Sequence, residues 1–156
     1  IISFFKYWKE VLKFFKLTNL DLSFNSLIYL SNNSFIGLRL LKILYLQNNQ
    51  ISFLDEECFS PMINLELLNL NQNKISKLTK FYFRNLTHLS QLDLFKNNID
   101  YIDESCFINN KNLIYLHLDY NNLTHIYSKT FESFYLLKNI RLNNNRLSNI
   151  SSMLFR

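Results

Sequence analysis

Residue types with G/C-rich codons are almost missing from this sequence of 156 residues. It contains no alanine, one valine (Val11), one glycine (Gly37) and one proline (Pro61). Several abundant types, among them asparagine, isoleucine, phenylalanine, tyrosine and lysine, have A/T-rich codons. The bias indicates the base composition of the genome rather than a function, so abundance alone gives no asparagine or lysine a role.

Long apolar runs are also absent. No stretch approaches the roughly 18 apolar residues that a membrane-spanning helix needs. Because 48% of the residues are nevertheless hydrophobic, the composition argues against a disordered chain. The sequence shows no secretory signal peptide and begins at Ile1. We therefore expect a segment of a longer protein, in which only other parts of the parent chain would contact a membrane.

A concentrated positive charge is missing as well. The formal net charge is +5, from 17 lysines and arginines against 12 aspartates and glutamates. Residues 1–16 contribute four lysines and one glutamate, a net +3, which leaves +2 for the rest of the chain. A nucleic-acid-binding protein presents a clustered basic stripe instead. We therefore expect no nucleic-acid partner.

Metal-binding residues are too few for a metal centre. Cys58 and Cys106 are the two cysteines, and no second pair of cysteine or histidine residues accompanies them at zinc-binding spacing. The sequence therefore predicts no metal and no cofactor.

What the sequence does contain is a 24-residue repeat, which occurs six times without an insertion or deletion. The first column of the repeat is Leu17, Leu41, Leu65, Leu89, Leu113 and Leu137. Further leucine or isoleucine columns follow at offsets of 3, 5, 10 and 13 residues. The asparagine column is Asn25, Asn49, Asn73, Asn97, Asn121 and Asn145. The phenylalanine column is Phe35, Phe59, Phe83, Phe107, Phe131 and Phe155.

Each column has a physical reason. The L-x-L stretch predicts a short strand with its leucines turned inward, and successive strands would pair in parallel about 4.8 Å apart. One repeat cannot bury its own leucines, so the core must come from stacking. A buried asparagine after the strand can bond backbone groups of the adjacent turn. The phenylalanines would fill the wider outer side.

The pattern L-x-x-L-x-L-x-x-N-x-L-x-x-L-x-x-x-x-F-x-x-L, over residues 17–156, resembles the 24-residue extracellular type of leucine-rich repeat. Toll-like receptor, Slit-type and chaoptin-type ectodomains carry such repeats. The resemblance implies an α/β-type solenoid, a horseshoe with a parallel β-sheet on the concave face and loops or short 3-10 turns on the convex face. The six repeats would span 17–40, 41–64, 65–88, 89–112, 113–136 and 137–156. Members of this family usually have Cys-rich caps, and none is present in this sequence.

Two regions depart from the pattern. Residues 1–16 are interpreted as the tail of a preceding divergent repeat; the alternative is an amphipathic helix with Phe4, Trp8 and Phe15 on its apolar side, which could touch a membrane. Asn110 stands where the other repeats have leucine, methionine or phenylalanine. We expect a local kink or looser packing at that residue.

The two cysteines occupy the same repeat position, two repeats apart. The strand spacing separates them by about 10 Å. A disulfide requires Cα atoms within about 7 Å. We therefore expect two buried free thiols.

The outward strand positions vary while the inward ones do not, as a recognition surface on a fixed scaffold would. An apolar group there consists of Ile43, Tyr45 and Leu67. Exposed aromatic and mixed charged side chains are typical of protein interfaces. The candidate ligand-binding residues are Tyr45, Asp93, Phe95, Tyr115, His117, Asp119, Tyr120 and Arg141. The alternative is that they are ordinary half-exposed strand residues.

An aspartate and a histidine on adjacent strands are the one pair of residues that could suggest catalysis. Asp93 and His117 should be neighbours on adjacent strands, but the next strand position holds Arg141 rather than a nucleophile. An open sheet also does not exclude water. We therefore expect no enzyme activity.

Four N-x-S/T sequons are present, at Asn32, Asn85, Asn122 and Asn149. The leading hypothesis is a ligand-recognition segment of a cell-surface receptor or of an adhesion or secreted protein, located outside the cell, whose partner is a protein ligand or co-receptor. The alternative is an intracellular, cytoplasmic scaffold built from the same repeat, consistent with the free cysteines and the missing caps.

Overall fold

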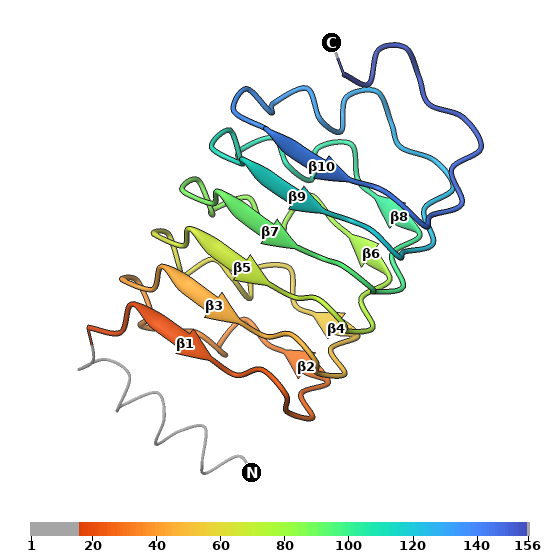
Figure 1. Ribbon diagram of the computed structural model, residues 1–156. Helices are drawn as coiled ribbons and strands as arrows, with labels where there is room; N and C mark the ends of the chain where they lie inside the picture. The colour runs from red at the N-terminus through yellow and green to blue at the C-terminus, as the bar shows by residue number, and fades with distance from the viewer. Residues whose placement is uncertain (1–15, 156) are drawn as a thin grey trace.

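Six three-residue strands, spaced along the chain by the repeat, pair into one parallel sheet (Figure 1). The computed structural model describes residues 16–155, so the predicted repeat tail and its helical alternative lie outside the described residues apart from Lys16. The strands of this main sheet, in spatial order, are β1 (Asn19–Asp21), β3 (Ile43–Tyr45), β5 (Leu67–Asn69), β7 (Gln91–Asp93), β9 (Tyr115–His117) and β10 (Asn139–Arg141).

The register of the main sheet follows the repeat without a slip. Leu44 of β3 pairs with Leu20 on one side and with Leu68 on the other. In each inner strand the middle leucine is buried while the residues on either side are exposed or half-buried. The strand predicted from L-x-L is therefore confirmed. Leu20 and Ile140 are only half-buried, because within the described residues β1 and β10 have a neighbouring strand on one side alone.

A second row of short strands lies on another side of each coil. β2 (Tyr29–Leu30) pairs with β4 (Phe53–Leu54), and β6 (Lys77–Leu78) pairs with β8 (Tyr101–Ile102), all in parallel. The repeat pattern predicted the buried leucines and isoleucine of this column but not the strands. The pairing arises because the column stacks in register and its backbone groups need partners.

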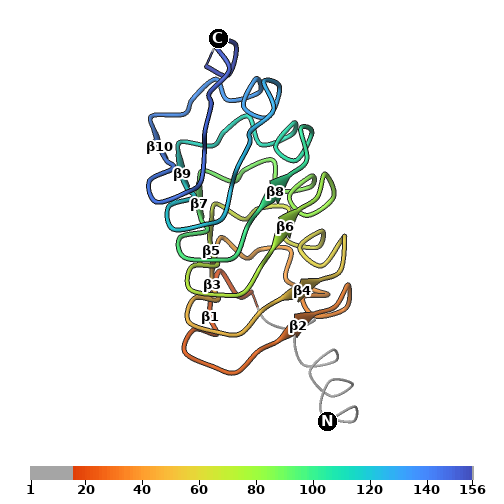
Figure 2. The same ribbon diagram turned by 90° about the vertical axis from the view of Figure 1, so that its right-hand side faces the viewer.

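The convex side is made of turns. Residues 16–155 contain no helix, and thus none long enough to cross a membrane. Bonds between residues three apart close these turns, for example from Cys58 N–H to Asp55 O (3.2 Å). Figure 2 shows the stack bending toward the main sheet, which lines the inner side of the bend. The predicted solenoid, with its sheet on the concave face, is confirmed.

The phenylalanine column forms a continuous stack in the core. Phe83 packs between Phe59 and Phe107, with ring centroids 6.3 and 5.9 Å apart and interplanar angles of 14° and 3°. Phe35 and Phe131 extend the stack at its two ends. Phe155 departs from the prediction. Its ring stacks on Phe131 but stays 62% exposed, since no further ring of the described residues covers it.

The asparagine column ties each turn to the next one. Asn97 is buried; its Nδ2 donates to the carbonyls of Leu70 (3.0 Å) and Leu94 (3.2 Å), and its Oδ1 accepts from Ile75 N–H (3.1 Å). The same set of bonds recurs at Asn49, Asn73 and Asn121. The predicted role of the column is therefore confirmed for these inner repeats. Asn25 is exposed, and within residues 16–155 it bonds only its own turn.

Asn110 does not loosen the packing. Its side chain is fully buried, and Nδ2 donates to the carbonyls of Phe83 and Leu86, both at 2.9 Å. The expectation of looser packing is wrong, because the amide bonds the backbone of the preceding repeat in place of an apolar contact. Its Oδ1 has no partner within residues 16–155.

Both cysteines are free and buried, as predicted. Burial raises the pKa of the Cys58 thiol to about 12, and the nearby Asp55 carboxylate adds to this effect. Burial also raises the pKa of the Cys106 thiol well above its ordinary value. Both residues are therefore neutral thiols at physiological pH and serve as small core residues.

Candidate functional site

The concave face of the main sheet carries the predicted recognition residues. Five of them end or begin a strand: Tyr45 in β3, Asp93 in β7, Tyr115 and His117 in β9, and Arg141 in β10. The other three, Phe95, Asp119 and Tyr120, follow β7 and β9 within three residues. Because alternate side chains of a strand point to opposite faces, the buried leucines fix the direction of these residues.

The register brings the C-terminal half of the predicted group together. Asp93 pairs with His117, and His117 pairs with Arg141, so the three form one row across neighbouring strands. Phe95 and Tyr120 make an edge-to-face contact, with ring centroids 5.2 Å apart at 68°. The repeat pattern predicted that both rings lie on this face but not that they touch. Tyr45 lies apart, three strands from Tyr115.

A shallow depression of about 120 Å³ opens between the strands β3 to β9. Two rows of side chains border it, one from the first and one from the last position of each strand. Its principal lining residues are Tyr45, Leu67, Asn69, Asp93, Tyr115 and His117. Cofactor and drug sites usually occupy about 300–1,000 Å³. The depression is therefore large enough for the end of one side chain but not for a cofactor.

Three polar residues at the last strand position also shape the turn that follows. Asp93 Oδ1 accepts from Phe95 N–H (2.9 Å), Asn69 Oδ1 from Asn71 N–H (3.1 Å) and Asp21 Oδ1 from Ser23 N–H (2.9 Å). Bonds from the Ser23 hydroxyl and amide lower the pKa of Asp21. This role was not predicted from the sequence, although aspartate and asparagine side chains commonly bond the backbone N–H two residues further along the chain.

The residue before each asparagine of the ladder has a left-handed backbone. The six φ angles lie between 52° and 56°, at Phe24, Asn48, Gln72, Lys96, Tyr120 and Asn144. Left-handed backbone costs a residue with a Cβ about 1–2 kcal/mol. In the first five of these residues the bond between the backbone N–H and a carbonyl of the next repeat offsets the cost, as from Tyr120 N–H to Asn143 O (2.9 Å). Glycine, the usual sequence signal for this geometry, is absent from the column.

Asp119 is not part of the accessible surface. Its side chain is only 6% exposed, and Oδ1 accepts from Asn143 N–H at 2.9 Å. The expectation that this carboxylate is free to contact a ligand is wrong, because the turn after β10 covers and bonds it. Asp119 therefore supports the backbone that presents Tyr120.

The Asp93 and His117 pair shows no catalytic arrangement. The two residues are register partners, as predicted, but Asp93 bonds Phe95 N–H and Asn71 Nδ2 (3.1 Å) rather than the imidazole. Arg141 stands at the next strand position. In the part of the chain that the structure describes, no group of three or more histidine, cysteine, aspartate or glutamate residues could hold a metal ion.

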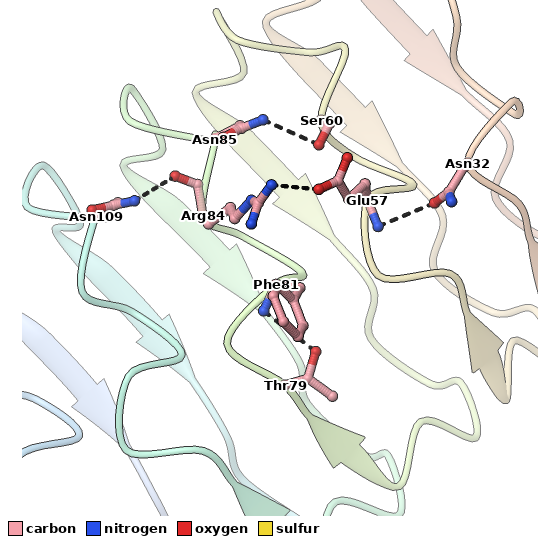
Figure 3. A network of polar contacts seen from close by, with 8 residues as sticks. All are labelled: Asn32, Glu57, Ser60, Thr79, Phe81, Arg84, Asn85 and Asn109. Carbon is pink, nitrogen blue, oxygen red and sulfur yellow. Dashed lines mark hydrogen bonds and ion pairs between the residues drawn. The ribbon is translucent and has the colours of Figure 1, made fainter.

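The convex turns carry a network of polar contacts between successive coils (Figure 3). Arg84 forms an ion pair with Glu57, and Glu57 N–H donates to Asn32 Oδ1 (3.1 Å). Asn85 Nδ2 donates to Ser60 Oγ at 3.1 Å. Exposed ion pairs contribute about 0–1 kcal/mol each. These residues join neighbouring turns to one another, so the network belongs to the scaffold.

The four sequons differ in exposure. Asn32, Asn85 and Asn149 are exposed, whereas Asn122 is half-buried beside the ladder residue Asn121. Asn32 and Asn85 lie on convex turns, away from the main sheet, as Figure 3 shows. Glycans at these two positions would leave the concave face open.

Known proteins resemble this chain throughout its repeats. A family model described as leucine rich repeat matches residues 15–75, 39–99, 63–123 and 87–147. Among solved structures, a chain of the Drosophila Toll–Spatzle complex is 29% identical, with a TM-score of 0.78 over 83% of this chain and 18% of that one. The APL1 leucine-rich repeat domain is 27% identical, with a TM-score of 0.79 over 83% of this chain and 35% of that one.

A leucine-rich repeat protein of Leptospira interrogans is also similar, at 28% identity and a TM-score of 0.83 over 94% of this chain and 36% of that one. The chain thus spans between 18% and 36% of these structures. No curated protein matches its sequence.

Proposed function

The chain belongs to the leucine-rich repeat family, and from this membership we propose that it is a ligand-recognition segment that binds a protein partner on its concave face. Repeats of this family typically mediate protein–protein binding and are generally non-enzymatic scaffolds. One observation carries the proposal: the exposed side chains of Tyr115 and Tyr120 lie on a face whose inward residues already provide the core, and Phe95 contacts Tyr120. Such rings are enriched at protein interfaces.

We further propose that the segment belongs to a cell-surface receptor or to an adhesion or secreted protein. The repeat type and the similarity to a chain solved in the Toll–Spatzle complex support this location and a protein ligand. The exposed sequons on the convex turns are consistent with a glycoprotein. A cytoplasmic scaffold that uses the same face is the alternative, and a test of glycosylation discriminates between the two.

The chain is expected to acquire N-linked glycans at Asn32 and Asn85 when a secreting cell produces it. Glycosidase treatment should then lower its mass, and Asn32→Gln or Asn85→Gln should each remove the mass of one glycan. Asn33→Gln is the matched control, since Asn33 is exposed beside Asn32 but begins no sequon. A secreted chain without any glycan would favour the cytoplasmic alternative.

Partner binding is tested with two pairs of tyrosines on different faces. A panel of purified extracellular proteins is screened with a multivalent form of the chain. For a protein that binds, Tyr115→Ala with Tyr120→Ala should raise the dissociation constant at least about tenfold, because aromatic hot spots each contribute about 1–2 kcal/mol or more.

The control is Tyr101→Ala with Tyr127→Ala. These tyrosines are 41% and 43% exposed, close to the 42% and 52% of Tyr115 and Tyr120, but they belong to the second row of strands and the turn beside it. Circular dichroism verifies that both variants fold. Equal loss of binding in the control, or none in the concave variant, would contradict the proposed surface.

A further inference from the structure

The depression on the concave face is lined by a carboxylate but by no lysine or arginine. The carboxylate is that of Asp93, which is half-buried there. Within residues 16–155 the ion pairs are Lys42 with Glu66 and Arg84 with Glu57, so Asp93 has no ionic partner. A nearby cation attracts a carboxylate more strongly at such a partly buried position than in open water.

The hydrogen bonds of Asp93 leave part of its carboxylate free. Oδ1 accepts from Phe95 N–H (2.9 Å) and Oδ2 from Asn71 Nδ2 (3.1 Å), and both donors are neutral. An ionised carboxylate offers about four lone-pair positions. These two bonds hold the group in a fixed orientation, while about two positions remain for a further donor.

The other acidic residues of this face differ from Asp93. Asp21 is exposed, receives two bonds from Ser23 and does not line the depression. Asp119 is buried under the next turn. Asp93 is therefore the carboxylate that combines partial burial, a fixed orientation and a cavity.

The rest of the lining suits the stem of a basic side chain. Leu67 offers an apolar surface for methylene groups, which lysine and arginine bury while they keep their charged ends hydrogen-bonded. Tyr115, on the strand beside Asp93, presents a ring that can attract a cation through its π face. The volume of about 120 Å³ admits the end of one such side chain.

We propose that this depression is a specificity site for a lysine or arginine side chain of the protein partner, bound by Asp93 and packed against Leu67 and Tyr115. The inference rests on the proposed function, since it names the chemistry of the partner at the same face. Recognition then requires a basic residue that projects from the partner's surface into the concave sheet.

The test uses the whole chain of 156 residues and small probes. Nitrogen-15 NMR spectra are recorded during titration with N-acetyl-lysinamide and N-acetyl-argininamide, and with N-acetyl-norleucinamide as the uncharged isostere. At least one cationic probe should cause saturable shifts at the amides of Asn69, Asp93 and Tyr115, with a dissociation constant on the order of 1–10 mM. The uncharged probe should bind at least about tenfold more weakly.

Asp93→Asn is the diagnostic variant, and it should weaken the cationic probe at least about tenfold. The new amide keeps an oxygen for Phe95 N–H. Its nitrogen can donate to Asn71 Oδ1 once the Asn71 amide turns by 180°, since Asn71 Nδ2 faces this position in the native chain. Asp21→Asn is the matched control, because Asp21 has the same repeat position and the same bond to the amide two residues on. It should leave probe binding unchanged.

Three results would overturn the inference: no saturable shifts with either cationic probe, equal binding of the norleucine probe, or full binding by a folded Asp93→Asn chain. None of these affects the partner screen with the tyrosine variants. A partner lost on Tyr115→Ala with Tyr120→Ala but insensitive to Asp93→Asn would therefore retain the proposed function and remove the cation site.

Discussion

Replacement of Phe83 by alanine is expected to lower the free energy of unfolding by about 3–5 kcal/mol, the largest effect of any single substitution considered. The ring is fully buried and stacks on both Phe59 and Phe107. Its removal leaves a cavity that Phe59 and Phe107 cannot fill, because the paired strands hold the neighbouring repeats at a fixed spacing. Equilibrium unfolding in urea, followed by circular dichroism, measures the change.

Two controls separate stacking from the loss of an aromatic residue as such. Phe53→Ala removes a ring that is 63% exposed and should cost less than about 1 kcal/mol. Phe35→Ala removes a buried ring that has one stacked neighbour among residues 16–155, so its cost should fall between the other two. Equal losses for Phe83 and Phe53 would show that the stack does not determine stability.

Asn97→Ala is expected to cost about 3 kcal/mol, even though it removes only a small polar side chain. The substitution leaves Ile75 N–H and the carbonyls of Leu70 and Leu94 without the bonds that Asn97 supplies. Each buried backbone group left unsatisfied costs about 1–3 kcal/mol. A water molecule that enters the space left by the side chain can bond some of these groups and recover part of the loss. Urea unfolding again provides the measurement.

The adjacent residue is the matched control. Asn98 is exposed, so Asn98→Ala should change the free energy of unfolding by at most about 0.5 kcal/mol. Asn97→Leu should not restore stability, because an apolar side chain fills space but bonds none of the three groups. A stable Asn97→Leu variant would mean that the column acts by packing rather than by hydrogen bonding.

The repeat predicted the scaffold well because its columns determine both the direction of each side chain and the pairing of the strands. Alternation around Leu44 and Leu68 determines which side chains turn inward, and the constant spacing determines which strands pair. The burial of a side chain depends less on its own repeat than these two properties do. Phe131 and Phe155 share one column, yet Phe131 is buried and Phe155 is largely exposed, since burial depends on a following repeat rather than on the residue itself.

The candidate site was predictable only in outline. Asp93 and Asp119 were both expected on the exposed face, but the turn that begins at Asn143 covers Asp119 alone. The contact between Phe95 and Tyr120 depends on the left-handed backbone of Tyr120. The sequence did not indicate this backbone, because Tyr120 is not a glycine. The depression at Asp93 requires the relative heights of side chains on four strands, and a single sequence does not contain these.

The register of the main sheet has a consequence for how the protein folds during its synthesis. Leu44 pairs with Leu68, and Leu68 with Leu92, so each new strand joins one that ended 24 residues earlier. The entropy of closing such a short loop is nearly the same for every repeat. A ribosome adds about 5–20 residues each second, so a further coil emerges every few seconds. Since loops close in well under a millisecond, each coil can dock on its predecessor before the next one is made.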